Sequence, residues 1–150
     1  ADIDCEKIVC DPTKPTELAA ALKSAVAADL IMIQDCQRPL TGLAQFERVY
    51  AALSADVDAV RPVSPFTETL KSITADDFID QTIDRNSMMR ISTPELVRYS
   101  AIDFDSDEST WFVPIKKSAK LATVNADADS ARINSEKEIE LMSYLLDWNK

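Results

Sequence analysis

Short apolar runs and amphipathic stretches alternate along the first 63 residues. Residues 7–10, 30–33 and 57–63 are the apolar runs and predict three strands, the second of them covered on both faces. Between them, apolar residues recur at helical spacing, with Pro15 suited to the first turn of one helix and Thr41 to the N-cap of the next. The stripe expected to face inward from the second helix consists of Leu43, Phe46, Tyr50 and Leu53.

This order of strand, helix, strand, helix, strand predicts parallel βαβ units with right-handed crossovers. Ligands of such sheets bind at the carboxyl ends of the strands. The polar loop at residues 34–40, directly after the second apolar run, is therefore the first place to look for chemistry.

The middle of the chain has a different pattern. Residues 66–71 and 78–83 alternate like half-exposed strands and predict a β-arm at about residues 64–92, with another strand at 88–91. Thr93-Pro94-Glu95 is typical of a helix start, with threonine as N-cap and proline in the first turn.

The last third of the chain predicts two strands and one helix. The strands are expected at residues 111–115 and 121–124, after an acidic loop at 103–109. Ser135-Glu136-Lys137-Glu138 is a capping box that opens the last helix, whose inner face is expected to carry Ile139, Met142, Leu145 and Leu146. The chain is interpreted as a single partial α/β domain over residues 1–150.

The charge balance narrows the possible partners. The chain has 150 residues, of which 26 are acidic and 16 are basic, giving a net charge of −10. Such a surface repels nucleic acids and anionic lipids, so a broad polyanion-binding face is not expected. No signal-peptide pattern precedes the first strand, which favours a cytoplasmic location.

Missing residue types exclude several chemistries within this sequence. It contains no histidine, which removes histidine-based zinc sites and histidine general bases. The three cysteines, Cys5, Cys10 and Cys36, form no CxxC pair and are expected to be reduced thiols. Gly42 is the one glycine, so the sequence holds no glycine-rich phosphate loop.

Five short segments of the chain, taken in their order along the sequence, form a pattern. Residues 29–39 read DLIMIQDCQRP, residues 65–71 read PFTETLK, residues 84–86 and 92–94 read DRN and STP, residues 106–109 read SDES, and residues 131–139 read ARINSEKEI. In this order and spacing they resemble the 2-C-methyl-D-erythritol 4-phosphate cytidylyltransferase family. Its members join a sugar-alcohol phosphate to CTP and release pyrophosphate, in the synthesis of isoprenoid precursors.

The departures from the family pattern fall mainly on the CTP side. The family's N-terminal glycine-rich loop has no counterpart here. Gln34 replaces a histidine, Cys36 a small residue, Glu95 a glutamine and Arg132 a lysine. The CTP-binding half is therefore absent or eroded, whereas the half that binds the sugar-alcohol phosphate is partly kept.

The resemblance implies a fold, a cofactor, a partner and a set of site residues. The implied fold is a Rossmann-like α/β domain with a mostly parallel sheet and a β-arm, lacking its N-terminal part. The arm implies a homodimer with shared sites, and the family uses Mg²⁺. The implied roles are metal binding for Asp35, charge stabilisation in catalysis for Arg38 and Arg132, and substrate binding for Thr69, Arg85, Thr93 and Ser106.

Each assignment has a purely structural alternative. Asp35 could cap its own turn, Arg38 could pair with Asp35, Thr93 could cap a helix and Ser106 could lie in a solvated loop. At the level of function, the alternatives are a catalytically inactive relative that binds a small molecule or a protein, and an unrelated α/β interaction module. The parent protein is expected to have the family activity, and this chain alone is expected to be inactive.

Overall fold

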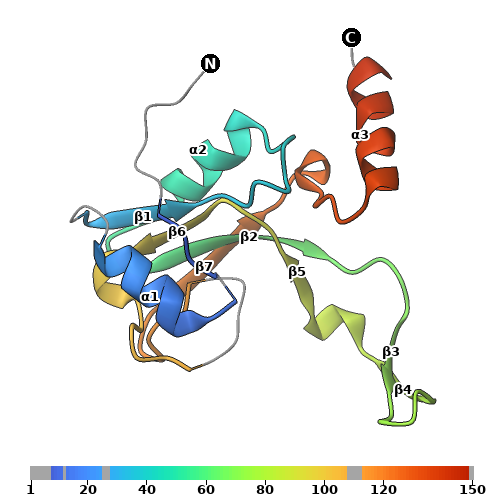
Figure 1. Ribbon diagram of the computed structural model, residues 1–150, viewed down its shortest axis with the longest axis horizontal. Coiled ribbons are helices and arrows are strands. Elements are labelled where there is room, and N and C mark those ends of the chain that lie inside the picture. The colour runs from blue at the N-terminus through green and yellow to red at the C-terminus, as the bar shows by residue number, and fades with distance from the viewer. Residues whose placement is uncertain (1–7, 12, 25–27, 108–112, 149–150) are drawn as a thin grey trace.

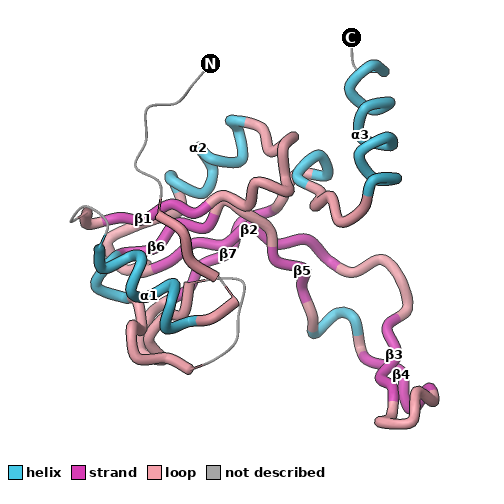
Figure 2. Tube along the Cα trace, viewed as in Figure 1, coloured by secondary structure: helices cyan, strands magenta, loops and turns pink. Residues whose placement is uncertain are grey.

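A mixed β-sheet with one helix on each face forms the body of the protein, and two segments project from it (Figure 1). The computed structural model describes residues 8–11, 13–24, 28–107 and 113–148. One projection is the β-arm and the other is the C-terminal helix (Figure 2). No helix among these residues is long and apolar enough to cross a membrane.

The sheet contains strands of both directions. β1 (Leu30–Ile33) and β2 (Ala59–Pro65) each pair antiparallel with β6 (Glu95–Arg98), which lies between them. β7 (Leu121–Asn125) pairs parallel with β2, and β5 (Met89–Ile91) pairs antiparallel with the far half of β2. Three strands, β1, β2 and β7, thus point the same way. The predicted α/β class is confirmed, with the antiparallel β6 inserted between the two strands of the first βαβ unit.

The two helices cover opposite faces of this sheet. α1 (Pro15–Ser24) packs Leu18 and Leu22 against a buried cluster that includes Val97 and Ile102. α2 (Leu43–Ala51) packs on the other face through Val49 and the residues that follow the helix. Successive residues of β2 and β6 point to opposite faces, so each strand contributes to both clusters.

The predicted inner stripe of α2 is wrong for two of its residues. Leu43 and Tyr50 are 73% and 65% exposed, whereas Gln45 and Val49, four residues apart, are fully buried. The N-cap residue is Gly42 and not Thr41. Thr41 instead uses its hydroxyl inside the preceding loop, where it donates to Arg38 O at 3.0 Å.

The helix predicted at Thr93 is also wrong. The Thr93–Pro94 peptide bond is cis, and β6 begins directly afterwards at Glu95. β6 lies between β1 and β2 and is buried along Glu95–Val97, so pairing on both edges overrides the local preference for a helix start.

Three smaller expectations also change. Residues 8–10 form no strand, residue 7 lies outside the described residues, and Met32 is 40% exposed, so β1 is not covered on both faces. Of the strand expected at 111–115, residues 111 and 112 lie outside the described residues, and Ile115 makes only an isolated bridge to Ile102. The cysteines, in contrast, agree with expectation: Cys10 and Cys36 are free thiols, and Cys5 lies outside the described residues.

The arm is a separate two-stranded sheet. β3 (Leu70–Ile73) pairs antiparallel with β4 (Ile79–Ile83), and the short helix η1 (Arg85–Ser87) leads back to β5 (Figure 1). The strand predicted at residues 78–83 is confirmed as β4, whereas the strand predicted at 66–71 begins only at Leu70. Their apolar side chains remain accessible, since Phe78 and Ile79 are each 71% exposed.

The last helix stands away from the sheet. α3 (Glu136–Trp148) begins with the predicted capping box: Ser135 N donates to Glu138 Oε2 at 3.1 Å, and Glu138 N donates to Ser135 Oγ at 3.4 Å. The predicted inner face is wrong at Ile139 and Leu146, which are 52% and 49% exposed, because the helix projects beside the body (Figure 1). The side chain of Leu145 lies outside the described part of the chain.

Two short 3-10 helices complete the fold. η2 (Tyr99–Ala101) follows β6, and η3 (Ala128–Ser130) follows β7. η3 leads into the segment that carries Arg132, and this segment returns to the carboxyl end of β1.

Candidate active site

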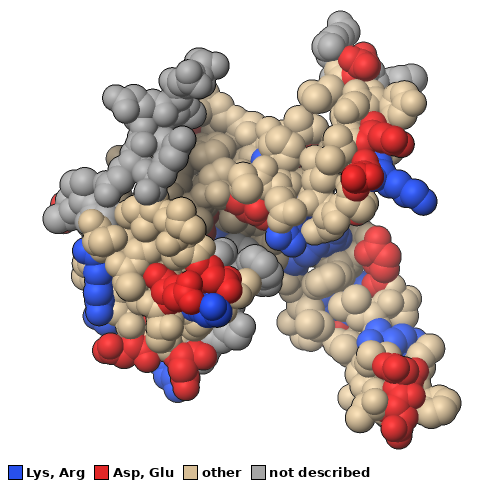
Figure 3. Space-filling model, viewed as in Figure 1, with Lys and Arg blue, Asp and Glu red and all other residues tan. Residues whose placement is uncertain are grey.

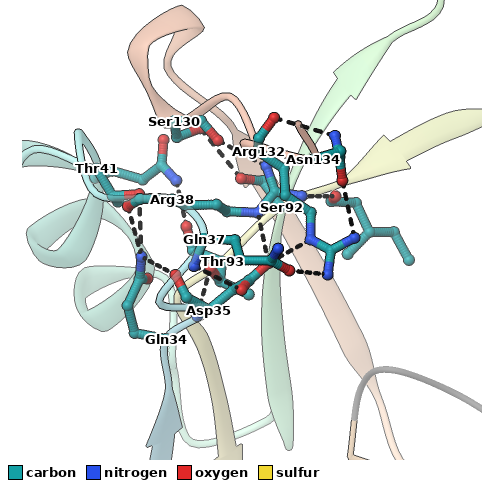
Figure 4. A network of polar contacts seen from close by, with 12 residues as sticks. Gln34, Asp35, Gln37, Arg38, Thr41, Ser92, Thr93, Ser130, Arg132 and Asn134 are labelled. Atoms are coloured by element: carbon teal, nitrogen blue, oxygen red, sulfur yellow. Dashed lines mark hydrogen bonds and ion pairs between the residues drawn. The ribbon is translucent and has the colours of Figure 1, made fainter. Parts of the chain in front are cut away.

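The loop after β1, where chemistry is expected, is closed by its own side chains. Asp35 Oδ1 accepts from Gln37 N at 2.9 Å, and Arg38 N donates to Asp35 O at 3.0 Å. Gln34 Nε2 donates to Thr41 Oγ1 at 3.1 Å (Figure 4). Asp35 therefore does cap its own turn, and this leaves its other oxygen, Oδ2, directed at cations.

Arg38 joins this loop to two distant segments. Its Nη1 donates to Ser130 O at 2.6 Å and its Nη2 to Ile91 O at 3.3 Å. Its Nε lies 3.6 Å from Asp35 Oδ2, and only 12% of the side chain is exposed. The predicted pairing of Arg38 with Asp35 is present, and the guanidinium also fixes the ends of β5 and η3.

Arg132 reaches the same carboxylate from the other side. Its Nε donates to Asp35 Oδ2 at 2.9 Å, its Nη1 to Asn134 Oδ1 at 3.1 Å, and its Nη2 to Gln37 Oε1. A main-chain bond from Ile133 N to Gln37 O at 2.8 Å runs alongside. Arginine suits this position because its planar fork can serve several acceptors at once.

Thr93 holds the backbone of the loop after β1. It is 4% exposed, and its Oγ1 accepts from Asp35 N at 3.1 Å. Its carbonyl oxygen accepts from Gln45 Nε2 at 2.7 Å. The predicted role of Thr93 as a helix cap is thus replaced by a bond that holds the backbone of Asp35.

The electrostatics of this cluster favour an anion. The guanidinium of Arg38 lies near those of Arg132 and Arg90 and near the carboxylate of Asp35, and Arg90 also acts on the carboxylate of Glu68. Burial lowers the pKa of Arg38, Asp35 opposes this, and the other two arginines lower that pKa further. Arg38 nevertheless stays protonated, as arginine does in proteins. Figure 3 shows basic atoms gathered between the body, the arm and α3 of this acidic protein.

The other three expected site residues lie elsewhere in the chain. Thr69 immediately precedes β3, and Arg85 begins η1, where its Nη1 donates to Thr67 O. Ser106 N donates to Asp103 O at 3.4 Å, in a loop whose Phe104 ring lies 5.0 Å from Lys23 Nζ of α1. Residues 108 and 109 of the acidic motif lie outside the described residues. The structure therefore brings together Asp35, Arg38, Thr93 and Arg132, whereas it places Thr69 and Arg85 on the arm and Ser106 in the loop after η2.

The donor set around Asp35 limits what it can offer a metal. No group of three or more histidine, cysteine, aspartate or glutamate side chains that could hold a metal occurs among the described residues. Asp35 is one carboxylate with both oxygens engaged, by Gln37 N and by Arg132 Nε. Because Mg²⁺ is often bound through one carboxylate plus phosphate oxygens and water, Asp35 fits the part of a single protein ligand.

A further ion pair, between Arg61 and Glu95, joins two central strands and has no signal in the sequence. Arg61 of β2 donates through Nε to Glu95 Oε1 of β6 at 2.6 Å and through Nη2 to Val113 O at 2.9 Å. Glu95 is fully buried, and burial raises the pKa of its carboxyl above the ordinary value although Arg61 opposes the shift. The pair explains how an acid is tolerated at Glu95, where the family pattern has a glutamine.

Comparison with known proteins places these features in a family. A family model described as "IspD: 2-C-methyl-D-erythritol 4-phosphate cytidylyltransferase" matches residues 11–111. The "Bifunctional enzyme IspD/IspF" of Rhodospirillum rubrum is 43% identical over 77 residues, which are 51% of this chain and 20% of that protein. The "2-C-methyl-D-erythritol 4-phosphate cytidylyltransferase" of Nocardia farcinica is 27% identical over 146 residues. That match covers 93% of this chain and 63% of the relative, so the chain spans less than two thirds of either protein.

Solved structures agree on the fold. The 4-diphosphocytidyl-2C-methyl-D-erythritol synthase of Anaerococcus prevotii superposes with a TM-score of 0.69 at 20% identity, covering 97% of this chain and 70% of that one. The 2-C-methyl-D-erythritol 4-phosphate cytidylyltransferase of Thermus thermophilus gives a TM-score of 0.66 at 18% identity, covering 89% and 69%. Since the family model covers more than half of the sequence and the fold agrees, this chain belongs to the 2-C-methyl-D-erythritol 4-phosphate cytidylyltransferase family.

Proposed function

We propose that this chain forms the sugar-alcohol-phosphate side of a CTP-dependent cytidylyltransferase, with 2-C-methyl-D-erythritol 4-phosphate as the acceptor. One observation carries the proposal. Asp35, Arg38 and Thr93 match the family pattern, and Arg132 stands where that pattern has a lysine. The four residues come from three separate segments of the sequence and meet in one network at the carboxyl end of β1 (Figure 4). A cytoplasmic location and a place in isoprenoid precursor synthesis belong to this proposal.

In the proposed reaction, the protein mainly positions anions and stabilises their charge. An oxygen of the acceptor's phosphate attacks the α-phosphorus of CTP, a new P–O bond forms, and the bond to pyrophosphate breaks. Two anionic groups meet, so cations must surround them. Arg38 and Arg132 supply that charge from opposite sides of Asp35.

We include Mg²⁺ in the proposal as a cofactor held in part by Asp35. The ion supplies charge neutralisation of phosphate oxygens when bound. Asp35 Oδ2 already accepts from Arg132 Nε at 2.9 Å, so phosphate and water must complete the coordination. This chain's own contribution is a carboxylate held in place by Thr93 and Gln37.

We also propose that the protein works as a homodimer joined through the arm. Ile73 and Ile79 of the two-stranded sheet and Phe78 of the turn that joins its strands are between 65% and 71% exposed. Such a sheet is marginal without a partner. Thr69 and Arg85 lie on this arm, away from the Asp35 network. An arm from a second copy could bring these two residues to the network of its neighbour, which would complete the expected substrate-binding set.

A second function, non-catalytic binding of a phosphorylated small molecule, is favoured by a specific observation. The sequence has one glycine and therefore no glycine-rich phosphate loop, and Arg132 has three side-chain acceptors within this chain. On this alternative, the site binds the sugar-alcohol phosphate and does not transfer CMP.

Two measurements on the same preparation separate these possibilities. Isothermal titration with 2-C-methyl-D-erythritol 4-phosphate reports binding, and release of pyrophosphate from CTP in the presence of Mg²⁺ reports transfer. Binding with transfer supports the enzyme and rules out the non-catalytic alternative. Binding without transfer supports the sugar-alcohol-phosphate site alone, since this chain by itself is expected to be inactive. Absence of binding by a folded protein would overturn the proposal, and Lys137→Gln serves as a charge-matched control for any arginine variant.

A further inference from the structure

The buried face of α2 carries an amide side chain. Gln45 is fully buried, and both ends of its amide are bonded: Nε2 donates to Thr93 O at 2.7 Å, and Oε1 accepts from Asp127 N at 2.5 Å. A buried amide is costly unless its hydrogen bonds are made, so these two bonds define its place. They join α2 to the link before β6 and to the turn after β7.

Each of the two partners continues into the candidate active site. Thr93 accepts from Asp35 N through its hydroxyl at 3.1 Å, so its position sets the backbone that carries the carboxylate. Asp127 O accepts from Ser130 Oγ at 2.7 Å, and Ser130 O accepts from Arg38 Nη1 at 2.6 Å. Gln45 is therefore connected to Asp35 through Thr93, and to Arg38 through Asp127 and Ser130.

We propose that Gln45 is a positioning residue for the phosphorylated sugar alcohol, an inference that rests on the proposed function. Its two bonds fix the distance between Thr93 and the turn at Asp127, and so between Asp35 and the segment that leads to Arg132. An apolar side chain of the same size would fill the space and remove the partner of the buried Thr93 carbonyl and of the part-buried Asp127 amide. Removing one partner of a buried bond carries the full desolvation cost of the group that remains.

Two substitutions distinguish positioning from packing. Gln45→Leu removes both bonds. Gln45→Glu keeps an acceptor for Asp127 N, but its carboxylate faces the carbonyl of Thr93 and cannot donate to it. A buried glutamate in such surroundings has a raised pKa, and its protonated form can donate again. The effect of Gln45→Glu should thus depend on pH, and that of Gln45→Leu should not.

The experiment measures the dissociation constant of 2-C-methyl-D-erythritol 4-phosphate by calorimetry on the full chain. Each value is divided by that of the unsubstituted protein at the same pH, because the ligand's own phosphate titrates. At pH 8.5 Gln45→Glu should bind roughly tenfold more weakly, as one unpaired buried group implies, and Gln45→Leu, which removes both bonds, should bind at least as weakly. At pH 5.5 the ratio for Gln45→Glu should approach one, and the ratio for Gln45→Leu should not change.

Val49→Ala is the matched control. Val49 is also fully buried, lies one turn further along α2, and packs with Val60 and Leu96 in an apolar cluster. This substitution should lower the free energy of unfolding and leave the dissociation constant unchanged. If Gln45→Leu behaves in the same way, Gln45 only supports folding and the inference is overturned.

A separate readout covers the case in which the unsubstituted protein does not bind the ligand. That result counts against the proposed function, and amide hydrogen exchange then decides the positioning role. The Asp35 N–H, which donates to Thr93 Oγ1, should exchange faster in both Gln45 variants than in Val49→Ala. Equal exchange rates in the three variants would overturn the inference.

Discussion

Arg132 Nε lies 2.9 Å from Asp35 Oδ2, although the two residues are 97 positions apart in the sequence. The bond fastens the segment before α3 to the loop after β1. It also places a guanidinium beside the one carboxylate of the hydrogen-bonded network that Figure 4 shows. Arg132 therefore holds the loop after β1 in place and also adds a positive charge to the site.

Replacing Arg132 should weaken binding of a phosphorylated ligand. In Arg132→Gln, Asp35 loses its closest cation, and the site loses one of the positive charges that attract an anion. Since bonds to charged groups are worth roughly 1.5–3 kcal/mol, the dissociation constant for 2-C-methyl-D-erythritol 4-phosphate should rise by about tenfold or more. Titration calorimetry measures this. Lys137→Gln removes the same charge at an exposed position on α3, and an equal effect of the two substitutions would contradict a local role for Arg132.

Removing Arg61 should destabilise the protein in a pH-dependent way. Burial holds the pKa of Glu95 above its ordinary value of 4.5, so the folded state binds this proton more tightly than the unfolded chain. The stability that Glu95 contributes is therefore fully present below pH 4.5 and is lost as the pH rises through the raised pKa. Without Arg61 the carboxylate has no counter-charge, and the pKa rises further.

The expected size of this effect can be measured by urea unfolding. Arg61→Met should lower the free energy of unfolding by roughly 3–5 kcal/mol at pH 8, the usual cost of breaking a buried pair, and by less at pH 5. The control is Arg48→Met, which breaks the ion pair between Arg48 and Asp127. The side chains of these two residues are 39% and 40% exposed. That loss should stay within about 1 kcal/mol. An equal loss at both pH values for Arg61→Met would refute the account of Glu95.

A charge on the arm should separate the proposed dimer. Phe78 is 71% exposed directly before β4, so Phe78→Asp should leave the fold of one subunit intact and oppose burial of the arm. Sedimentation velocity should show the dimer dissociation constant raised by roughly tenfold or more, as for a central apolar interface residue. Leu43→Asp, at a 73% exposed position on α2, should leave association unchanged. A protein that is monomeric before substitution would rule out the dimer.

Loss of the N-cap should loosen α3 locally. Ser135 Oγ accepts from Glu138 N at 3.4 Å, and removing such a cap costs about 1 kcal/mol. Because α3 projects from the body, Ser135→Ala should speed amide exchange in its first turn by roughly fivefold and leave global unfolding unchanged. Ser143→Ala removes a hydroxyl that bonds only within the helix, to Ile139 O at 2.9 Å, and is the matched control. A fall in global stability with Ser135→Ala would show that α3 unfolds together with the sheet.

Local patterns identified most elements of this fold. The strands at residues 30–33 and 121–124, the arm strand at 79–83 and the capping box at Ser135 follow from nearby residues and occur where they are expected. The first arm strand, expected at residues 66–71, begins four residues later at Leu70. The helix predicted at Thr93 fails because β6 is flanked by β1 and β2, which come from much earlier in the chain. Local preference carries no information about such neighbours.

The site was only partly visible in the sequence for a similar reason. Asp35, Arg38, Thr93 and Arg132 were found through their resemblance to a family pattern, and the structure adds how they contact one another. Gln45 was missed because a polar residue on a helix predicts exposure, and only tertiary contacts show that its amide is bonded on both sides. The apolar Leu43 and Tyr50 were expected inside instead, and they face outward.

The long sequence separation between Arg38 and its hydrogen-bond partners determines when the site forms during folding. Its guanidinium bonds to carbonyl groups 53 and 92 positions away, so both long loops must close before it is held. Closing such loops costs chain entropy that only a nearly complete sheet can offset. The arrangement of Arg38 beside Asp35 is thus a late product of folding, and a fragment of this chain that ended before Ser130 would lack it.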